Sequence, residues 1–313
     1  MKYGLLKYST GNIGDEIQSL AARQFIPSVD YYFDRDQLNT IDVKEPTKVI
    51  MNGWFLQKPQ NWPPSSFIFP KFISFHITHK NECLKYFSSR KSIEYLKRHE
   101  PIGCRDYWTL NFLDSLGVKT YFSGCLTLTL RKNEIKRNNE ILIVEPFNQL
   151  YLRNHSELIK EFVPDKIRSH LEFITHWDPY TIKDYQTRFL FAEKLLQKYQ
   201  SAKLVITSRL HCALPCLAYG TPVYFIDIGY CSTEERNRFD GLIGHLDTIK
   251  IDNTMFNPLI KYGVKYFQIE YFKKILSRDV FKKIDWEKNV NLNDKTKLLR
   301  ANICGSIESF IKN

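Results

Sequence analysis

Three short stretches of the sequence place charged or proton-transferring side chains after an apolar run and at the start of a helical pattern. They are residues 11–16 (GNIGDE), 102–106 (IGCRD) and 208–211 (SRLH). A helix N-terminus presents free backbone amides and favours negative charge. Side chains that follow the strands of a parallel sheet gather at one edge of that sheet. The three stretches are therefore candidate parts of one anion-binding site.

The first stretch supplies backbone rather than charge. Glycines after a strand let the main chain approach a ligand closely, so Gly11, Asn12 and Gly14 are candidate binding residues. The pattern is neither a full GxGxxG nor a P-loop, because no Lys-Ser or Lys-Thr pair follows. Asp15 is a candidate orienting or proton-accepting group. A plain tight turn, with Asp15 as a first-turn helix acid, is the alternative.

The other two stretches supply cations and an imidazole. Arg105 follows a short strand, with Asp106 beside it; a surface ion pair with Asp106 as helix N-cap is the alternative. Ser208, Arg209 and His211 stand between a strand and a helix. Arginine grips carboxylate or phosphate with two hydrogen bonds, and histidine transfers protons near neutral pH. A capping Ser208 with a structural His211 is the competing interpretation.

Weaker candidates surround these stretches. Arg236 and Arg238 follow the last apolar strand, where one of them could reach the same edge. His76 and His79 have a spacing of three, but no carboxylate accompanies them in the sequence, so no metal site is predicted. Two tryptophans, Trp54 and Trp62, could line a cleft, although core packing is the commoner use.

The composition limits the partners. The 313 residues carry a formal charge of +11, from 45 Lys and Arg against 34 Asp and Glu. A basic protein attracts anions, but no dense basic run, zinc-finger spacing or RRM signature appears, so nucleic acid is not expected. The seven cysteines form no CxxC pair, which favours reduced thiols in the cytoplasm. No signal-peptide h-region and no apolar run of about 18 residues is present, so no transmembrane segment is expected.

The elements that must position these residues alternate between strands and helices in both halves, which predicts an α/β fold with parallel sheets and a cleft at the carboxyl ends of their strands. The polar stretch 131–139 predicts a boundary between domains at 1–135 and 136–313. Strands are expected at 3–9, 30–33, 48–52, 72–76, 102–105, 118–122, 140–145, 204–207 and 222–228. Helices are expected at 15–25, 81–99 (with a connector), 107–116, 156–162, 181–199, 211–219, 264–276 and 294–312.

Three blocks resemble the polysaccharide pyruvyl transferase family: GNIGDEIQSLAAR (11–23), PIGCRDYWTLNFLDSLGVKTYFSGCLTLTL (101–130) and AKLVITSRLHCALPCLAYGTPV (202–223). Together they cover about a fifth of the chain, in both halves. The resemblance implies two Rossmann-like domains in a GT-B-like arrangement with a cleft between them. The N-terminal domain would bind the acceptor and the C-terminal domain phosphoenolpyruvate, with the last helix packing back on the N-terminal domain.

The resemblance also implies a reaction. Phosphoenolpyruvate is the expected donor, and a ketal-linked pyruvate on the 4- and 6-hydroxyls of a hexose or N-acetylhexosamine is the expected product, with no further cofactor. Functional positions are implied at Arg105, Arg209 and His211, and for a basic residue after the strand that follows the His211 helix, here Arg236 or Arg238. The oligomeric state is not indicated.

Two other functions fit the same layout. One is a nucleotide-sugar glycosyltransferase of the GT-B type, in which Glu234 or Glu235 would bind a ribose. The other is a non-catalytic module that binds a glycan or an anion. Fold alone does not separate these functions.

Overall fold

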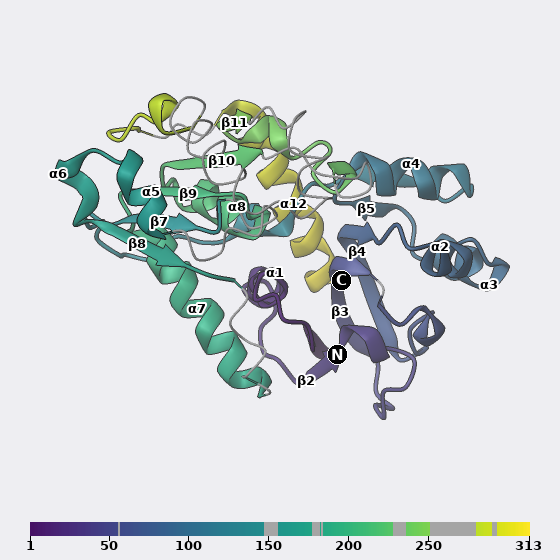
Figure 1. Ribbon diagram of the computed structural model, residues 1–313. Helices are drawn as coiled ribbons and strands as arrows, with labels where there is room; N and C mark the ends of the chain where they lie inside the picture. The colour runs from purple at the N-terminus through teal and green to yellow at the C-terminus, as the bar shows by residue number, and fades with distance from the viewer. Residues whose placement is uncertain are drawn as a thin grey trace.

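The structure is a computed structural model, and it describes residues 1–55, 57–146, 156–176, 182, 184–227, 236–250, 280–289 and 293–313 (Figure 1). The helix expected at 264–276 and the candidate residues Glu234 and Glu235 lie outside the described residues.

The first half of the chain forms a six-stranded parallel sheet in the order β2-β1-β3-β4-β5-β6. Its strands are β1 (Lys2–Lys7), β2 (Tyr31–Asp34), β3 (Thr47–Phe55), β4 (Ile68–Ile77), β5 (Ile102–Cys104) and β6 (Thr120–Phe122). The strand order reverses between β1 and β3. In open parallel sheets, this switch point is where a ligand crevice forms.

The second half repeats the plan with a five-stranded parallel sheet in the order β11-β10-β9-β7-β8. Its strands are β7 (Ile141–Val144), β8 (Leu171–Ile174), β9 (Leu204–Thr207), β10 (Val223–Asp227) and β11 (Thr248–Lys250). Here the order reverses between β7 and β9. The predicted α/β class with two parallel sheets, consistent with Rossmann-like halves, is confirmed.

Helices connect these strands. They are α1 (Gly14–Arg23), α2 (Asn81–Phe87), α3 (Arg90–Lys97), α4 (Tyr107–Ser115), α5 (Ser156–Phe162), α6 (Asp165–Arg168), α7 (Tyr185–Ser201), α8 (Leu210–Tyr219) and α12 (Asp294–Lys312), with a 3-10 turn η3 (Leu126–Thr129). Within the described part of the chain, none of these helices has the length and apolarity needed to cross a bilayer.

One apolar core spans both sheets. Buried side chains from α1, η3, β7, α7, α8 and α12 pack into a single cluster that includes Ile17, Leu126, Val144, Leu195 and Ile303. Two further clusters lie within one half each, around Phe75 in the first and around Ile206 in the second. The largest of the three clusters therefore contains residues of both halves. The division into domains at 135/136 stays a prediction.

A buried ion pair joins the halves beside this core. The Nε of Arg188 in α7 donates to Oε1 of Glu16 in α1 at 2.6 Å, and both side chains are almost completely buried. Burial raises the pKa of Glu16 to about 7, although the hydrogen bond from Arg188 acts in the opposite direction. This buried ion pair holds α7 against α1.

The last helix, α12, contacts the first half of the chain (Figure 1). Nζ of Lys48 in β3 donates to the backbone carbonyls of Phe310 at 2.9 Å and Ile311 at 3.0 Å, at the C-terminus of the helix. A cation at this end complements the helix dipole. Leu299 of α12 packs directly on Gly124. A Cβ built on Gly124 would lie 2.7 Å from Cδ2 of Leu299.

Candidate active site

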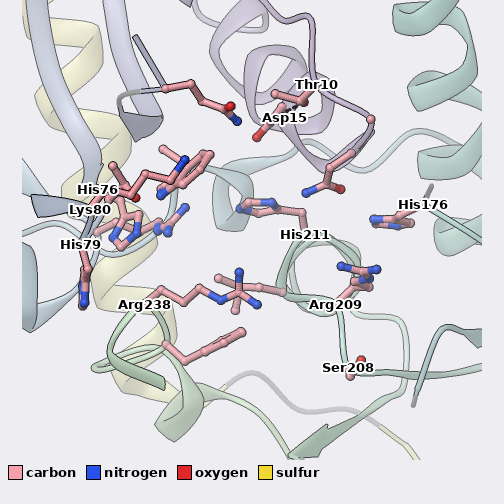
Figure 2. A pocket seen from close by; sticks show the side chains of 18 of the residues that line it. Thr10, Asp15, His76, His79, Lys80, His176, Ser208, Arg209, His211 and Arg238 are labelled. Carbon is pink, nitrogen blue, oxygen red and sulfur yellow. Dashed lines mark hydrogen bonds between the residues drawn. The ribbon is translucent and has the colours of Figure 1, made fainter. Parts of the chain in front are cut away.

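A pocket of about 730 Å³ opens where the carboxyl ends of strands from both sheets meet (Figure 2). The loops after β1, β4, β5, β8 and β9 contribute to it, together with the end of β3 and the segment after β10. Its lining residues are Ser9, Thr10, Gly11, Asn12, Asp15, Trp54, Gln57, His76, Thr78, His79, Lys80, Arg105, His176, Ser208, Arg209, Leu210, His211, Arg238 and Phe239.

Most of the residues singled out from the sequence lie in this wall. Gly11, Asn12, Asp15, Arg105, Ser208, Arg209, His211 and Arg238 all line the pocket. Three others do not: Gly14 lies directly behind His211, Asp106 is buried behind the wall, and Arg236 is exposed. Of the two tryptophans, Trp54 lines the pocket and Trp62 packs in the core of the first half.

Hydrogen bonds fix the entry to α1. Asn12 Oδ1 accepts from the amide of Gly14 at 3.1 Å. Asp15 Oδ2 accepts from Thr10 Oγ1 at 2.6 Å, and Asp15 Oδ1 accepts from Gln18 Nε2 at 3.2 Å. The Asp15 carboxylate is therefore held at the pocket rim by its own helix and the loop before it.

A buried arginine supports Asp15 from behind. Arg35 is 1% exposed, and its Nη1 lies 3.6 Å from Asp15 Oδ2. The guanidinium lies 4.9 Å from the ring centroid of Tyr8 and 5.8 Å from that of Trp54, and it bonds Asp36 on its far side. Arg35 therefore contacts the Asp15 carboxylate from the side opposite the pocket.

The loop after β9 holds Arg209 against an acidic partner. Arg209 Nε donates to Glu145 Oε2 at 2.7 Å, and Ser208 Oγ donates to the Glu145 carbonyl at 2.7 Å. Thr175 Oγ1 donates to the second carboxylate oxygen at 2.5 Å. Glu145, at the end of β7, has φ 43°, a left-handed conformation that a non-glycine residue adopts at a cost. These bonds fix the direction of the Arg209 guanidinium.

His211 lies between the two halves. A Cβ built on Gly14 would lie only 3.0 Å from His211 Nδ1, so the imidazole packs directly on the first turn of α1. Its Nε2 is buried and has no hydrogen-bond partner within the described ranges. Burial and then the positive charge of Arg105 hold the pKa of His211 well below its ordinary value. The imidazole is therefore neutral at pH 7.

Arg105 and Arg238 supply positive charge from opposite halves. Arg105 is 3% exposed, and burial lowers its pKa, with Asp106 opposing the effect and Arg238 adding to it. Arginine nevertheless stays protonated in proteins. The guanidinium of Arg238 lies 4.7 Å from the ring centroid of Phe239. Of the two arginines predicted after β10, Arg238 is the one in the pocket, and Arg236 is not.

The surroundings of Asp106 differ from those expected for a residue in a surface ion pair. It is fully buried, and its Oδ1 accepts from the Thr109 amide at 2.9 Å, so it is the N-cap of α4. Arg105 Nε is 3.9 Å from Asp106 Oδ2. That same oxygen lies 2.5 Å from Nδ1 of His76. The interpretation as N-cap is right, whereas the interpretation as a surface ion pair is wrong.

Sequence reasoning weighed His76 and His79 only as metal ligands and did not single out Lys80 or His176. His76 at the end of β4 and His79 and Lys80 just after it lie on one side of His211, and His176 lies on the other (Figure 2). His79 stacks on Trp108 with ring centroids 3.5 Å apart. His176 Nε2 lies 2.5 Å from the hydroxyl of Tyr199, and burial followed by the charge of Arg209 lowers the pKa of His176 to about 3. Their position after a strand was the only signal available.

Cations and helix N-termini dominate the pocket. Residues just before or within the first turns of α1 and α8 line it, and three arginines stand in its wall. This arrangement suits a small ligand with more than one negative group. Over the ranges that the structure covers, no three His, Cys, Asp or Glu side chains are arranged to hold a metal ion.

The fold and the site together define an α/β protein with two parallel sheets and an arginine-rich pocket that residues of both halves line. The family model for polysaccharide pyruvyl transferase matches residues 12–230, more than half of the sequence, so the chain belongs to this family. The resemblance seen in the three sequence blocks is thereby confirmed. Membership indicates a transferase that acts in glycan biosynthesis, with a sugar or glycan as acceptor.

Other comparisons are more distant. A crystal structure of a functionally uncharacterized protein from Klebsiella pneumoniae subsp. pneumoniae NTUH-K2044 is 15% identical in sequence, with a TM-score of 0.43. The match covers 80% of this chain and 93% of that chain. No curated protein matches the sequence.

Proposed function

We propose that the protein transfers the pyruvyl group of phosphoenolpyruvate to two hydroxyls of one sugar residue, forming a cyclic ketal. One observation carries the proposal: Arg105, Arg209, Arg238 and a buried neutral His211 line a single pocket between the two sheets. In this proposal the two halves have a GT-B-like arrangement, and the pocket is the reaction cleft.

Donor binding follows from the charges of the pocket. Phosphoenolpyruvate carries a carboxylate and a phosphate a few bonds apart, and each group can accept two hydrogen bonds from one guanidinium. Arg105 and Arg209 bind these two groups, with Arg238 and the free amides of α8 contributing positive potential. Because three cations and two helix N-termini face one pocket, a trianion is favoured over a neutral sugar at this position.

The proposed reaction moves protons to carbon and away from two hydroxyls. A proton adds to the methylene carbon, the first sugar hydroxyl forms a C–O bond to the adjacent carbon, phosphate leaves, and the second hydroxyl closes the ketal. One proton is thus consumed and two are released, one of which the departing phosphate takes. The donor's negative charge offsets the neighbouring arginines and raises the pKa of His211, so that its imidazolium delivers the proton to the methylene carbon.

The acceptor is proposed to present its 4- and 6-hydroxyls, because these two oxygens close a six-membered ring with the ketal carbon. Asp15 faces the pocket with its carboxylate held by Thr10 and Gln18. A carboxylate in a fixed position orients a sugar hydroxyl well, because it accepts hydrogen bonds but donates none.

The test combines phosphoenolpyruvate with a panel of hexose and N-acetylhexosamine acceptors, free and nucleotide-linked. Phosphate release is followed by a colorimetric assay, and mass spectrometry detects the pyruvate ketal on the sugar. Thermal shift with phosphoenolpyruvate and with UDP-sugars separates this proposal from a nucleotide-sugar glycosyltransferase. Stabilisation by UDP-sugars alone, with no ketal formed, would refute the proposal.

Replacing His211 gives the matched test of the mechanism. His211→Ala is expected to lower kcat by about 10²–10⁴-fold, the usual contribution of general acid catalysis, while phosphoenolpyruvate still binds. His99→Ala removes a half-buried histidine outside the pocket wall and should leave kcat unchanged. Calorimetric titration measures binding, and phosphate release measures turnover. Normal turnover of His211→Ala would exclude this residue as the acid.

A further inference from the structure

The proposed reaction moves one proton onto the methylene carbon and removes one from each of two sugar hydroxyls. His211 delivers the proton to carbon, and the leaving phosphate takes the proton of one hydroxyl. The other hydroxyl loses its proton as its C–O bond forms. A base other than His211 can take that proton if it lines the pocket and has an imidazole nitrogen with an available lone pair.

Asp15 is poorly placed for that task. Its two carboxylate oxygens are already engaged by Thr10 and Gln18, and Arg35 lies behind it. The hydrogen bonds from Thr10 and Gln18 hold both oxygens of the carboxylate in fixed positions. Asp15 therefore suits orientation of a hydroxyl better than removal of its proton.

His76 differs from Asp15 in its partner. Burial lowers the pKa of His76 to about 4, and the Asp106 carboxylate acts in the opposite direction. Its ring lines the pocket from the end of β4, and Nδ1 lies 2.5 Å from Asp106 Oδ2 and 3.3 Å from Thr109 Oγ1. Nε2 forms no hydrogen bond with any residue in the described stretches. A carboxylate at Nδ1 requires the proton to sit on that nitrogen, which leaves the lone pair of Nε2 as an acceptor.

The carboxylate is itself held rigidly. Asp106 is completely buried, and its other oxygen accepts from the Thr109 amide at 2.9 Å, in the first turn of α4. The imidazole cannot turn without breaking a buried, charge-assisted hydrogen bond. His76 and Asp106 thus form a carboxylate–imidazole pair of the kind that activates hydroxyl groups in other enzymes.

We infer that His76 accepts the proton of an acceptor hydroxyl through Nε2, and that Asp106 is the positioning residue that fixes its tautomer. The inference rests on the proposed function. In the balanced step, the hydroxyl O–H bond breaks as the new C–O bond forms, the proton moves to Nε2, and the positive charge formed on the ring is stabilised by the Asp106 carboxylate. Solvent then takes the proton, which restores the neutral ring.

The first measurement does not depend on activity. Protein labelled with ¹⁵N-histidine is examined by NMR near pH 7, with His76 assigned by its loss in His76→Asn. We expect the His76 signals of an Nδ1–H tautomer with an unprotonated Nε2. Asp106→Asn keeps a good helix N-cap. In this variant we expect the signals of the fixed Nδ1–H tautomer of His76 to change, because the carboxylate that holds the proton on Nδ1 is gone. A proton on Nε2 of the wild-type residue would overturn the inference.

The second measurement is kinetic. His76→Asn places an amide where Nδ1 was, so it can keep the bond to Asp106 but removes the pocket nitrogen. We expect kcat to fall by about 10²–10⁴-fold, with the Kd for phosphoenolpyruvate changed less than about threefold, because the affected interaction belongs to the transition state. Asp106→Asn should lower kcat by at least about tenfold with the same retention of binding.

The control is His99→Asn, a half-buried histidine that packs on Tyr95 away from the pocket. It should keep full kcat. Circular dichroism confirms that each variant is folded. Full turnover in a folded His76→Asn protein overturns the inference, even if the wild type forms ketals. If the wild type forms no ketal with any acceptor, the proposed function fails, and the NMR result alone decides whether the tautomer is fixed as inferred.

Discussion

At the scale of single residues, the pocket combines cations that come from distant parts of the sequence. Arg105 follows β5, Arg209 follows β9 and Arg238 lies beyond β10, yet all three line one pocket. Two of them act on His211, whose pKa is lowered first by burial and then by Arg105, with His176 and Arg238 adding to it. A ligand that neutralises these charges therefore also changes the protonation of the imidazole.

Arg238 and Arg236 offer a matched pair for testing this charge. Arg238→Ala should weaken phosphoenolpyruvate binding by about 10–100-fold, since a hydrogen bond to a charged group contributes about 1.5–3 kcal/mol. Arg236→Ala removes the same charge from an exposed position two residues away and should change affinity less than about threefold. Calorimetric titration provides both values. Equal losses of affinity in the two variants would mean that the net charge of the protein, and not the position of Arg238, determines phosphoenolpyruvate binding.

The cationic residues of the pocket could be predicted from the sequence, but the residues that hydrogen-bond to the pocket side chains could not. Arg105, Arg209 and His211 were accessible because each follows an apolar strand and precedes a helical pattern. The partnership of His76 with Asp106 was not, because it depends on β4 lying next to β5. Spacing along the chain carries no information on which strands become neighbours. The same reason hides the bond between Arg209 and Glu145.

At the scale of secondary structure, the site depends on the close approach of two helix N-termini. Gly14 begins α1, His211 is in the first turn of α8, and the imidazole fills the space where a side chain on Gly14 would be. Each helix is the next element after the carboxyl end of a parallel strand, β1 for α1 and β9 for α8. Their common position explains why positive potential and an imidazole coincide.

Gly14→Ala tests this contact. Its Cβ would lie 3.0 Å from Nδ1 and 3.2 Å from Cβ of His211, so the imidazole must shift. A displacement at a reacting group is expected to lower kcat by about tenfold or more. Gly305→Ala, in α12 with no atom near the new Cβ, should keep kcat and raise stability by about 0.5–1 kcal/mol. Unchanged kcat in Gly14→Ala would show that α8 adjusts freely.

Most strands and helices were predictable because their apolar residues follow a regular pattern. The strand expected at 204–207 and the helix expected at 294–312 coincide with β9 and α12. The pattern does not predict β8 and β11, the two edge strands of the second sheet. With four residues in β8 and three in β11, these strands are too short for an alternation of apolar and polar residues to stand out from the neighbouring sequence.

At the scale of the whole molecule, the two sheets share one core and one buried ion pair. The central cluster contains residues of β1, α1 and η3 together with residues of β7, α7, α8 and α12. Unfolding either half alone would expose this surface and separate Glu16 from Arg188. The halves are thus coupled energetically.

We expect a single cooperative thermal transition. Differential scanning calorimetry should give a calorimetric enthalpy close to the van't Hoff enthalpy, with the ratio near one, as for a two-state protein. Phosphoenolpyruvate should shift the whole transition upward rather than split it, because the pocket draws on both halves. Two separate transitions would show that the halves unfold independently despite the common core.

Glu16 should make stability depend on pH. Burial raises the folded-state pKa to about 7, above the ordinary value of 4.5, so the folded protein holds this proton more tightly than the unfolded chain does. The contribution of Glu16 to stability therefore falls as pH rises from about 4.5 to 7, by at most about 1.4 kcal/mol per pH unit. Glu16→Gln should flatten this decline in urea unfolding, whereas Glu94→Gln, an exposed carboxylate, should not.

The position of α12 also sets an order of events during synthesis. Ile303 and Ile307 of this helix pack into the cluster that holds Leu126 and Leu128, and Leu299 covers Gly124. The ribosome makes these residues long after both sheets. Until residues 294–312 have emerged, the nascent chain exposes an apolar surface beside η3. Molecular chaperones bind exposed apolar surface of this kind. Translation of α12, rather than of either sheet, is then the step that covers this surface.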